Sequence, residues 1–305
     1  MTDKTFLLNA GTRIPALGLA PSHAGTWQSP PGQVTAAVAH ALKSGYKLVD
    51  GAYCYANEDE VGAGLKEAFD AGVKREDIFV VTKVWTTYNT RVELGLDKSL
   101  KSLGAGLRND DRFPKLPDGS RDIIRTHNHV DTWKLMEKLV ATANAPRGEQ
   151  YSKRYLEQLL PHATIVPAVN QIENHPALPQ QEIVDLCKEK GIHIMAYSPL
   201  GSTGGPLMEA EPVKKIAEKH GVSPSTVLLS YHKSADDWII VSRGSTVLAK
   251  SVTPARIDAN RQLIDLDAED QKALQEYSDA LTKEGKLQRF VYPPFGIDFG
   301  FPDKS

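Results

Sequence analysis

Short apolar runs alternate along the chain with longer segments in which apolar residues recur every three or four positions. Residues 78–81 form an unbroken apolar run, while Val61, Leu65 and Phe69 share one face of a helix that should end at Gly72. A run such as 78–81 is typical of a strand that is buried on both sides. Strands that alternate with helices in this way build parallel sheets through βαβ units. The pattern therefore predicts an α/β fold and implies a barrel.

The same periodicities predict the other elements. Residues 5–8 and 13–17 should form an N-terminal hairpin with a turn at Gly11, which could plug one end of a larger structure. The other predicted strands are residues 46–52, 165–172, 192–197 and 245–249. The other predicted helices lie around residues 34–42, 92–103, 130–140, 155–160, 181–190, 213–220, 226–231, 257–263 and 274–277.

The alternation breaks in the middle of the chain. The polar, proline-containing residues 108–119 join one predicted helix to the next without a strand, and residues 144–149 do the same once more. Two strands are therefore expected to be absent. Strand number, tilt and shear are linked in a closed barrel. Either residues 105–108, 141–145 or 238–241 fill the gap, or the barrel stays open with exposed edges.

Composition narrows the class of protein. The chain has 305 residues, 41% of them hydrophobic, with no low-complexity linker or internal repeat, so we expect a single domain over residues 1–305. Its 36 basic and 38 acidic residues are mixed, which argues against a nucleic-acid or membrane surface. Cys54 and Cys187 are too few for a disulfide framework or a four-cysteine zinc site, and no metal is expected. The chain shows neither a leader-like N-terminus nor a long apolar stretch, so we expect a soluble cytoplasmic protein.

Candidate chemistry lies at the ends of two consecutive predicted strands. Asp50, Tyr55 and Lys83 fall where a parallel barrel builds its active site. A free tyrosine, with a pKa of about 10, is a poor acid near neutrality, but a neighbouring ammonium stabilises its phenolate and lowers that pKa. Asp50 would hold Lys83 by an ion pair. Each residue also has a purely structural interpretation: a helix cap or structural ion pair for Asp50, a rim aromatic for Tyr55 and a solvent-reaching lysine for Lys83.

Several blocks resemble, in order, the signature motifs of aldo-keto reductases. They are DGAYCY at residues 50–55 followed by Asn57 and Glu58, TKVW at 82–85, VNQIENHP at 169–176, AYSPLGS at 196–202 and KSVTP at 250–254. The similarity is strongest to the fungal glycerol dehydrogenase and glyceraldehyde reductase branch and extends over nearly the whole chain. It implies a TIM (β/α)8-type barrel with an N-terminal hairpin, here incomplete or distorted.

The resemblance also implies a reaction. In such reductases the tyrosine that matches Tyr55 donates a proton to the substrate carbonyl oxygen, while NADPH delivers hydride to the carbonyl carbon. The residues that match Lys83 and Asp50 tune this tyrosine. We therefore expect Tyr55, Lys83 and Asp50 to be catalytic.

Cofactor positions follow from the same blocks. Their matches here are Gln171 and Tyr197 at the nicotinamide, Ser198, Leu200 and Ser202 along the pyrophosphate, Lys250, Ser251 and Thr253 at the 2′-phosphate, and Arg256 and Asn260 at the adenine. The cation pair of Lys250 and Arg256 suits a phosphate dianion better than a ribose hydroxyl, which favours NADPH over NADH. Without the surrounding block, both could equally be surface charges around a helix start.

The first strand-end motif of the family is displaced. Gly25 and Thr26 match positions where the backbone approaches the cofactor, and Trp27 matches a tryptophan that walls the substrate pocket, together with Trp85. Residues 20–24 stand between this motif and the preceding strand-like segment, where the family has almost none.

A second departure concerns a histidine. The family carries its fourth catalytic residue at the end of the fourth strand, in an apolar segment ending His-Trp-Pro, and this chain has no such segment. His127 and His129 are nearest, but they resemble the start of the next helix and are interpreted as surface or helix-cap histidines. The serine and asparagine that accompany Gln171 in the family are missing with the fifth strand.

Three hypotheses about function follow. The first is an NADPH-dependent reductase of small aldehydes or sugar-derived carbonyls, which could also oxidise polyols in reverse; a monomer is expected from the resemblance. Residues 292–299 resemble the substrate loop of the family. The second is a catalytically impaired relative that still binds NADPH. The third is a non-functional product of alternative splicing or of an incorrect reading frame.

Overall fold

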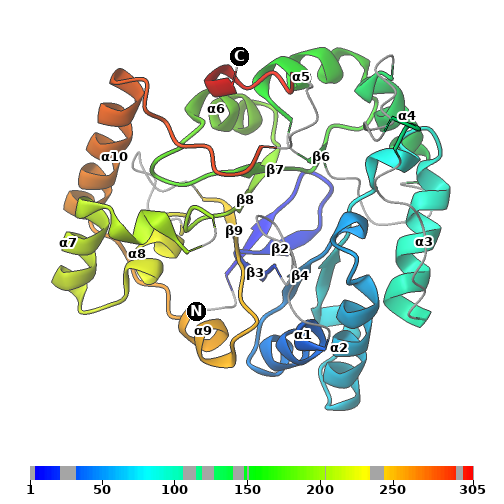
Figure 1. The fold of residues 1–305 in the computed structure, drawn as a ribbon, viewed down its shortest axis with the longest axis horizontal. Coiled ribbons are helices and arrows are strands. Elements are labelled where there is room, and N and C mark those ends of the chain that lie inside the picture. Colours follow the sequence, from blue (N-terminus) through cyan, green and yellow to red (C-terminus); the bar gives the residue numbers. More distant parts are fainter. Residues whose placement is uncertain are drawn as a thin grey trace.

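A parallel sheet surrounded by helices forms the centre of the protein in a computed structural model, which describes residues 4–20, 32–105, 115–118, 127–139, 148–149, 151–202, 204–233, 244–292 and 298–304 (Figure 1). The sheet has seven strands in the order β5-β4-β3-β9-β8-β7-β6, with every pair parallel. Its strands are β3 (Leu17–Leu19), β4 (Leu48–Asp50), β5 (Phe79–Val81), β6 (Gly148–Glu149), β7 (Val169–Glu173), β8 (His193–Tyr197) and β9 (Thr246–Ala249). This arrangement confirms the predicted α/β fold of an incomplete TIM-type barrel.

Helices ring the sheet in Figure 1, and each predicted helix is present. The α-helices are α1 (Gln33–Lys43), α2 (Glu58–Asp70), α3 (Val92–Ala105), α4 (His129–Leu139), α5 (Lys153–Leu159), α6 (Gln181–Glu189), α7 (Glu211–His220), α8 (Pro224–Ser230), α9 (Pro254–Ala259) and α10 (Ala268–Lys283). Short 3-10 helices are η1 (Tyr53–Tyr55), η2 (Arg75–Asp77), η3 (Thr86–Tyr88), η4 (Leu160–His162), η5 (Pro206–Glu209) and η6 (Pro302–Lys304). Among the helices that the structure describes, none combines the length and apolar character needed to cross a lipid bilayer.

The predicted N-terminal hairpin is present and closes the amino end of the barrel. Its strands β1 (Thr5–Leu7) and β2 (Arg13–Pro15) pair antiparallel, and the turn contains Gly11 at a φ of 78°. Ile14 of the hairpin is fully buried in a cluster that includes Leu48, Met195 and Leu248 from the strands. The hairpin therefore covers the apolar interior at the end opposite the strands' carboxyl termini.

His193, the first residue of β8, joins this hairpin to the sheet. Its ring lies 4.8 Å from that of Phe6, its Nε2 accepts a hydrogen bond from the Thr246 N–H at 3.2 Å, and the Thr246 hydroxyl donates to the Pro15 carbonyl at 2.9 Å. Burial lowers the pKa of His193 from 6.5 to about 4. The folded protein therefore holds this imidazole neutral at a pH where the unfolded chain protonates it.

Measuring the free energy of unfolding at several pH values tests whether the His193 imidazole is neutral in the folded protein. Between pH 6.5 and about 4 the unfolded state binds more protons than the folded state. His193 should therefore lower the free energy of unfolding as pH falls through that window, by up to about 3 kcal/mol. In chemical denaturation at a series of pH values, His193→Gln should show a flatter decline than wild type, and the exposed control His162→Gln should follow wild type. If the free energy of unfolding fell with pH equally in His193→Gln and in wild type, His193 would not be the neutral group.

The break in the alternation is smaller than the sequence predicts. Residues 144–149 are expected to be loop, but Gly148 and Glu149 form β6, which pairs parallel with Asn170 and Gln171 of β7. The prediction of two absent strands is wrong at this point. A strand of two residues is too short to show the alternation of apolar and polar positions by which strands are predicted.

The gap itself lies between β5 and β6. Among the residues that the structure describes, no strand pairs with both β5 and β6, which are the two ends of the described sheet. Phe79 and Val80 of β5 are only partly buried, which corrects the prediction of a strand buried on both sides; β5 has a strand neighbour on one side alone in this part of the chain. Three segments were considered for the gap: 105–108, 141–145 and 238–241. Ala105 is the last residue of α3, and the rest of these segments lies outside the described residues.

Candidate active site

The predicted catalytic residues meet at the carboxyl end of the sheet. Asp50 is the last residue of β4, Lys83 follows β5, and Tyr55 ends the η1 turn. Because β4 and β5 are parallel and paired from Leu48 to Asp50, their carboxyl ends lie side by side. Two backbone hydrogen bonds, from Gly51 N–H to the Val81 carbonyl and from Tyr53 N–H to the Lys83 carbonyl, continue the pairing into the loops. This pairing brings η1 beside the segment that carries Lys83.

Lys83 connects the other two side chains. Its Nζ donates to Asp50 Oδ2 at 2.6 Å and to the Gly51 carbonyl at 2.8 Å, and lies 3.5 Å from the Tyr55 hydroxyl. The ammonium also sits 5.1 Å from the centre of the Tyr55 ring. The side chains of Lys83 and Asp50 are only 8% and 2% exposed, so this ion pair is shielded from water and from salt. Tyr55 itself is partly exposed and can reach a ligand.

Gln171 makes a contact that the sequence does not predict. This buried residue lies inside β7, and its Nε2 donates to Asp50 Oδ1 at 2.9 Å, with Met195 Sδ at the same distance. Both carboxylate oxygens of Asp50 are therefore occupied, one by Lys83 and the other by Gln171. The resemblance implies a nicotinamide contact for Gln171 and gives no sign of this bond to Asp50.

Glu58 contacts the segment that carries Lys83. It is buried at the start of α2, and the hydroxyl of Thr82 donates to its Oε1 at 2.5 Å. Thr82 directly precedes Lys83, so this bond fixes the backbone from which the lysine extends. Both residues belong to the quoted sequence blocks, but the contact between them becomes visible only in the folded chain.

Two non-glycine residues with left-handed backbone follow the site tyrosines. Ala56 has a φ of 59° directly after Tyr55, and Ser198 has a φ of 51° directly after Tyr197. Non-glycine residues seldom adopt this conformation, which costs about 1–3 kcal/mol and concentrates at functional sites. The strain marks the two tight turns that leave η1 and β8.

The residues expected at the nicotinamide and pyrophosphate lie around the end of β8. Tyr197 is its last residue and is partly buried, and Ser198, Leu200 and Ser202 follow in the turn before η5. Gly201 has a φ of 95° in this turn, and a Cβ there would lie 2.9 Å from Pro206 Cγ. The backbone of this turn is therefore closely packed against η5.

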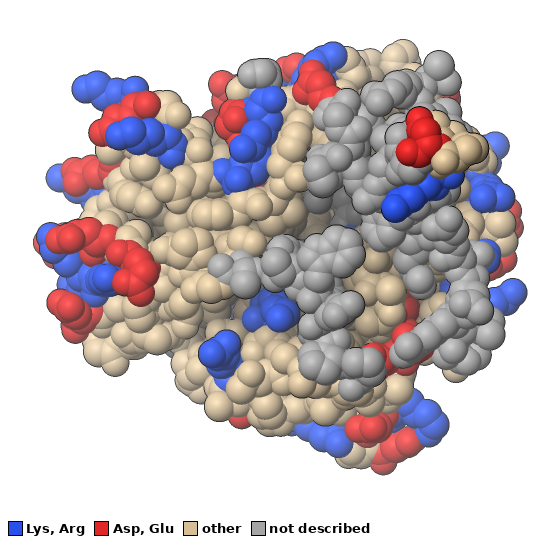
Figure 2. Space-filling view, in the orientation of Figure 1, with Lys and Arg blue, Asp and Glu red and all other residues tan. Residues whose placement is uncertain are grey.

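The residues expected at the adenosine phosphate surround the start of α9. Ser251 is buried and its Oγ accepts the Thr253 N–H at 3.1 Å, whereas Lys250, Thr253 and Arg256 are exposed. Asn260 is buried and caps the end of the helix. Figure 2 shows basic side chains at the surface over the place that α9 occupies in Figure 1. The start of α9 is thus flanked by two exposed cations and two hydroxyl groups, a donor set that suits a phosphate.

Of the substrate-pocket residues, the structure describes only Trp85. It is partly buried, two residues after Lys83, and caps η3. Gly25, Thr26 and Trp27 lie outside the described residues.

The two nearest histidines interact with their own helical neighbourhood. His127 Nε2 lies 2.5 Å from the hydroxyl of Thr132 in α4. His129 begins α4, stacks on the Tyr155 ring at 4.8 Å and lies 3.3 Å from the Tyr155 carbonyl. Burial lowers the pKa of His129, which favours a neutral ring. The side-chain cap at the start of α4 comes from Asn128, whose Oδ1 accepts the Val130 N–H at 2.9 Å.

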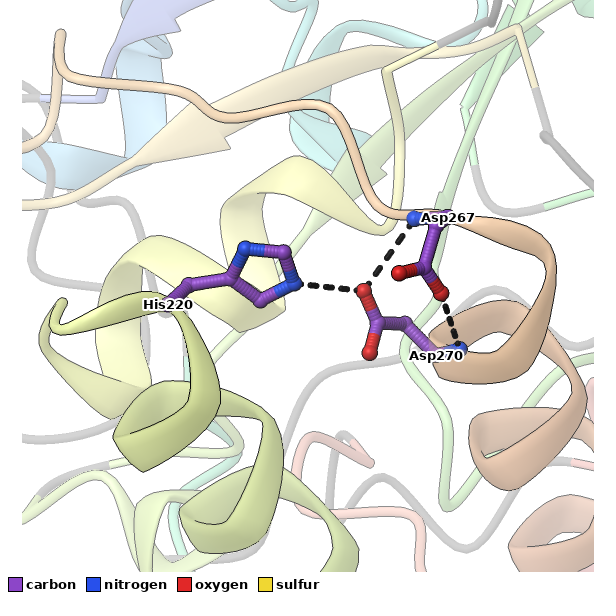
Figure 3. A group of neighbouring side chains, drawn as sticks. All are labelled: His220, Asp267 and Asp270. Carbon is purple, nitrogen blue, oxygen red and sulfur yellow. Dashed lines mark hydrogen bonds and ion pairs between the residues drawn. The ribbon is translucent and has the colours of Figure 1, made fainter.

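A separate charged cluster joins α7 to α10 (Figure 3). His220 Nε2 lies 2.6 Å from Asp270 Oδ2, and Lys219 Nζ donates to Asp270 at 2.8 Å and to Asp267 at 2.7 Å. Asp267 and Asp270 also form the capping box of α10. The hydrogen bond from Lys219 lowers the pKa of Asp267 to about 2. Although the ligand atoms of His220, Asp267 and Asp270 lie within 4.8 Å of one another, the Lys219 ammonium already binds these carboxylates, so the cluster is a helix cap.

Comparison with known proteins agrees with this geometry. The chain is 66% identical over 322 aligned positions to the D-galacturonate reductase of Hypocrea jecorina, covering 100% of both chains. It is 40% identical to glycerol 2-dehydrogenase (NADP(+)) of Saccharomyces cerevisiae, covering 97% of each. The solved aldose reductase of Schistosoma japonicum superposes with a TM-score of 0.78 and 33% identity, covering 94% of this chain and 93% of that one.

The family comparison covers most of the chain. Residues 16–279, which include every strand of the parallel sheet, match the aldo/keto reductase family. Together with the relatives above, this match confirms the resemblance seen in the sequence blocks. The chain therefore belongs to the aldo/keto reductase family and is an oxidoreductase that uses a nicotinamide cofactor.

Proposed function

We propose that this protein uses NADPH to reduce sugar-derived carbonyls and small aldehydes to alcohols, and that it oxidises the corresponding polyols in reverse. The observation that carries the proposal is the position of the Lys83 ammonium, which bonds Asp50 and lies 3.5 Å from the Tyr55 hydroxyl. A positive charge beside a phenol stabilises the phenolate that remains after proton transfer. In this proposal Tyr55 donates its hydroxyl proton to the carbonyl oxygen, and the buried Asp50 holds Lys83 in place by an ion pair.

The donor set at α9 fits the cofactor. Lys250 and Arg256 would bind the 2′-phosphate of NADPH, with Ser251 and Thr253 supplying hydroxyl and backbone donors. Tyr197 and the turn after β8 would hold the nicotinamide half. When bound, NADPH supplies the hydride that reaches the carbonyl carbon.

The substrate class rests on the names of the relatives. One acts on D-galacturonate and another on glycerol, so a polyhydroxylated carbonyl or its alcohol is the class that both share. We infer that the same class binds beside Tyr55, with Trp85 as one wall.

The direct test follows NADPH consumption by the full-length chain with D-galacturonate and with D-glyceraldehyde. Turnover with either substrate supports the proposal. Binding of NADPH without turnover would favour the catalytically impaired relative instead. Rapid proteolysis together with no thermal stabilisation by NADPH would favour the non-functional product, because a ligand that binds only the folded state must raise its stability.

Cofactor choice tests the role of Lys250 independently of turnover. Loss of a charge-assisted hydrogen bond costs about 1.5–3 kcal/mol, so Lys250→Leu should weaken NADPH binding by about 10- to 100-fold. Binding of NADH, which lacks the 2′-phosphate, should change little. Titration of both cofactors would measure the difference, with Lys272→Leu on the exposed side of α10 as the matched loss of charge. Equal weakening for NADPH and NADH would contradict a phosphate contact.

A further inference from the structure

Glu173 is a buried carboxylate at the mouth of the barrel. It is the last residue of β7, is 0% exposed, and pairs with Tyr197 at the end of β8. Residues two apart on a strand point to the same face, so the side chain of Glu173 shares the face of Gln171, whose amide reaches Asp50. Glu173 therefore lies about 7 Å further along this face, toward the open end of the barrel.

The partners of Glu173 come from the far end of the chain. Its Oε1 accepts the Phe290 N–H at 2.8 Å, and its Oε2 accepts the Val291 N–H at 3.0 Å. His175 Nε2 lies 3.1 Å from Oε1, and the His175 ring packs on Phe290 at 5.5 Å. One carboxylate thus binds two consecutive backbone amides of the segment that follows α10. Figure 1 shows this segment passing from α10 toward the end of β7.

Arg289, between α10 and η6, anchors the same segment a second time. Its guanidinium, 1% exposed, forms a two-pronged ion pair with Asp303 at 2.7 and 2.8 Å and stacks over Phe301 at 4.0 Å. It also donates to Gln180 Oε1 at 2.8 Å, while the Gln180 amide donates to the Glu173 carbonyl. Residues 288–292 are therefore bound to the end of β7 through both the side chain and the backbone of Glu173.

A buried carboxylate is costly unless its oxygens are hydrogen-bonded, and here the bonds are directed at backbone amides of a single segment. We propose that Glu173 is a positioning residue that fixes residues 288–292 across the carboxyl end of β7 and thereby sets the affinity for the carbonyl substrate. This inference rests on the proposed function, since it assumes that the substrate enters beside Tyr55. Glu173 acts through the segment that it holds and takes no part in proton transfer.

Glu173→Gln tests the proposal with little change in shape. The new amide group would point a donor at a backbone N–H, so one of the two amides would lose its acceptor. If residues 288–292 stay anchored in only about a tenth of the molecules, the KM for the carbonyl substrate should rise roughly tenfold. The value of kcat should stay within about threefold, and NADPH affinity should be unchanged. Glu189→Gln, on an exposed glutamate of α6, is the matched control and should leave all three values unchanged.

Hydrogen exchange separates anchoring from catalysis. In Glu173→Gln, peptides covering residues 287–292 should exchange faster, while peptides of β8 and β9 should not change. Arg289→Lys leaves Glu173 intact and should also raise KM. This second variant keeps the proposal testable if Glu173→Gln folds poorly. Faster exchange with unchanged KM would overturn the link to substrate affinity, and unchanged exchange would overturn the anchor itself. Absence of turnover in the wild-type chain would instead contradict the proposed function, while hydrogen exchange would still test the anchor.

Discussion

Replacing Tyr55 with phenylalanine is expected to lower kcat for carbonyl reduction by about 10²- to 10⁴-fold, the range that a positioned acid contributes. The change removes only the hydroxyl that lies 3.5 Å from Lys83 Nζ and keeps the ring beneath the ammonium. The free energy of unfolding and the affinity for NADPH should both be retained, because neither the ion pair of Lys83 with Asp50 nor the residues around α9 are altered. Steady-state kinetics and a cofactor titration on the same preparation would measure both quantities.

Tyr53→Phe is the matched control for this prediction. Tyr53 lies in the same η1 turn, and its ring packs edge-on against Tyr88 at 5.5 Å. Its variant should retain kcat within about threefold. If Tyr55→Phe kept wild-type activity, proton donation would have to be assigned to another group and the proposed role of Tyr55 abandoned.

Replacing Asp50 with asparagine is expected to have the largest effect on stability. Lys83 is nearly excluded from water, and breaking a buried ion pair by removing one partner costs about 3–5 kcal/mol, because the remaining charge is left uncompensated. The loss should appear as a lower midpoint in chemical denaturation. Activity should fall as well, since the Lys83 ammonium would lose its 2.6 Å bond and Gln171 would lose its charged acceptor.

Asp70→Asn supplies the comparison for an exposed pair. Asp70 Oδ2 accepts from Lys66 Nζ at the same 2.6 Å, but the two side chains are 64% and 74% exposed. Exposed pairs contribute about 0.2–1 kcal/mol, so this variant should shift the midpoint only slightly. Equal shifts for the two variants would mean that burial of the Lys83 pair adds nothing, contrary to the structure.

The contact of Asp50 with Lys83 could be predicted from the sequence because it depends on a general property of parallel sheets. Both residues follow neighbouring parallel strands, and such strands end at one edge of the sheet. The helices could be predicted as well: Val61 and Leu65, four positions apart, are buried in α2, and Phe69 is partly buried. Strand β6 was missed because two residues carry no periodicity, and its existence depends on the backbone of β7.

Contacts between distant residues were also missed at the site. The bond from Gln171 to Asp50 joins residues 121 positions apart, and that from Phe290 to Glu173 spans 117. The motif around Gln171 and Glu173 identifies the family, yet no spacing within it shows which partner each side chain meets. Such contacts follow from the way the sheet curves around its interior, which depends on packing between elements that are far apart in the sequence.

The neighbours of β3 have a consequence for synthesis of the chain. Leu17, Gly18 and Leu19 pair with Val247, Leu248 and Ala249 of β9, so the first strand of the sheet needs a partner that is made 230 residues later. Until β9 leaves the ribosome, one edge of β3 stays without this partner, and the interior that Leu248 helps to fill stays incomplete. Such long-range pairing slows folding and prolongs exposure of apolar surface. The interior of the sheet should therefore stay partly exposed to water until β9 has been made.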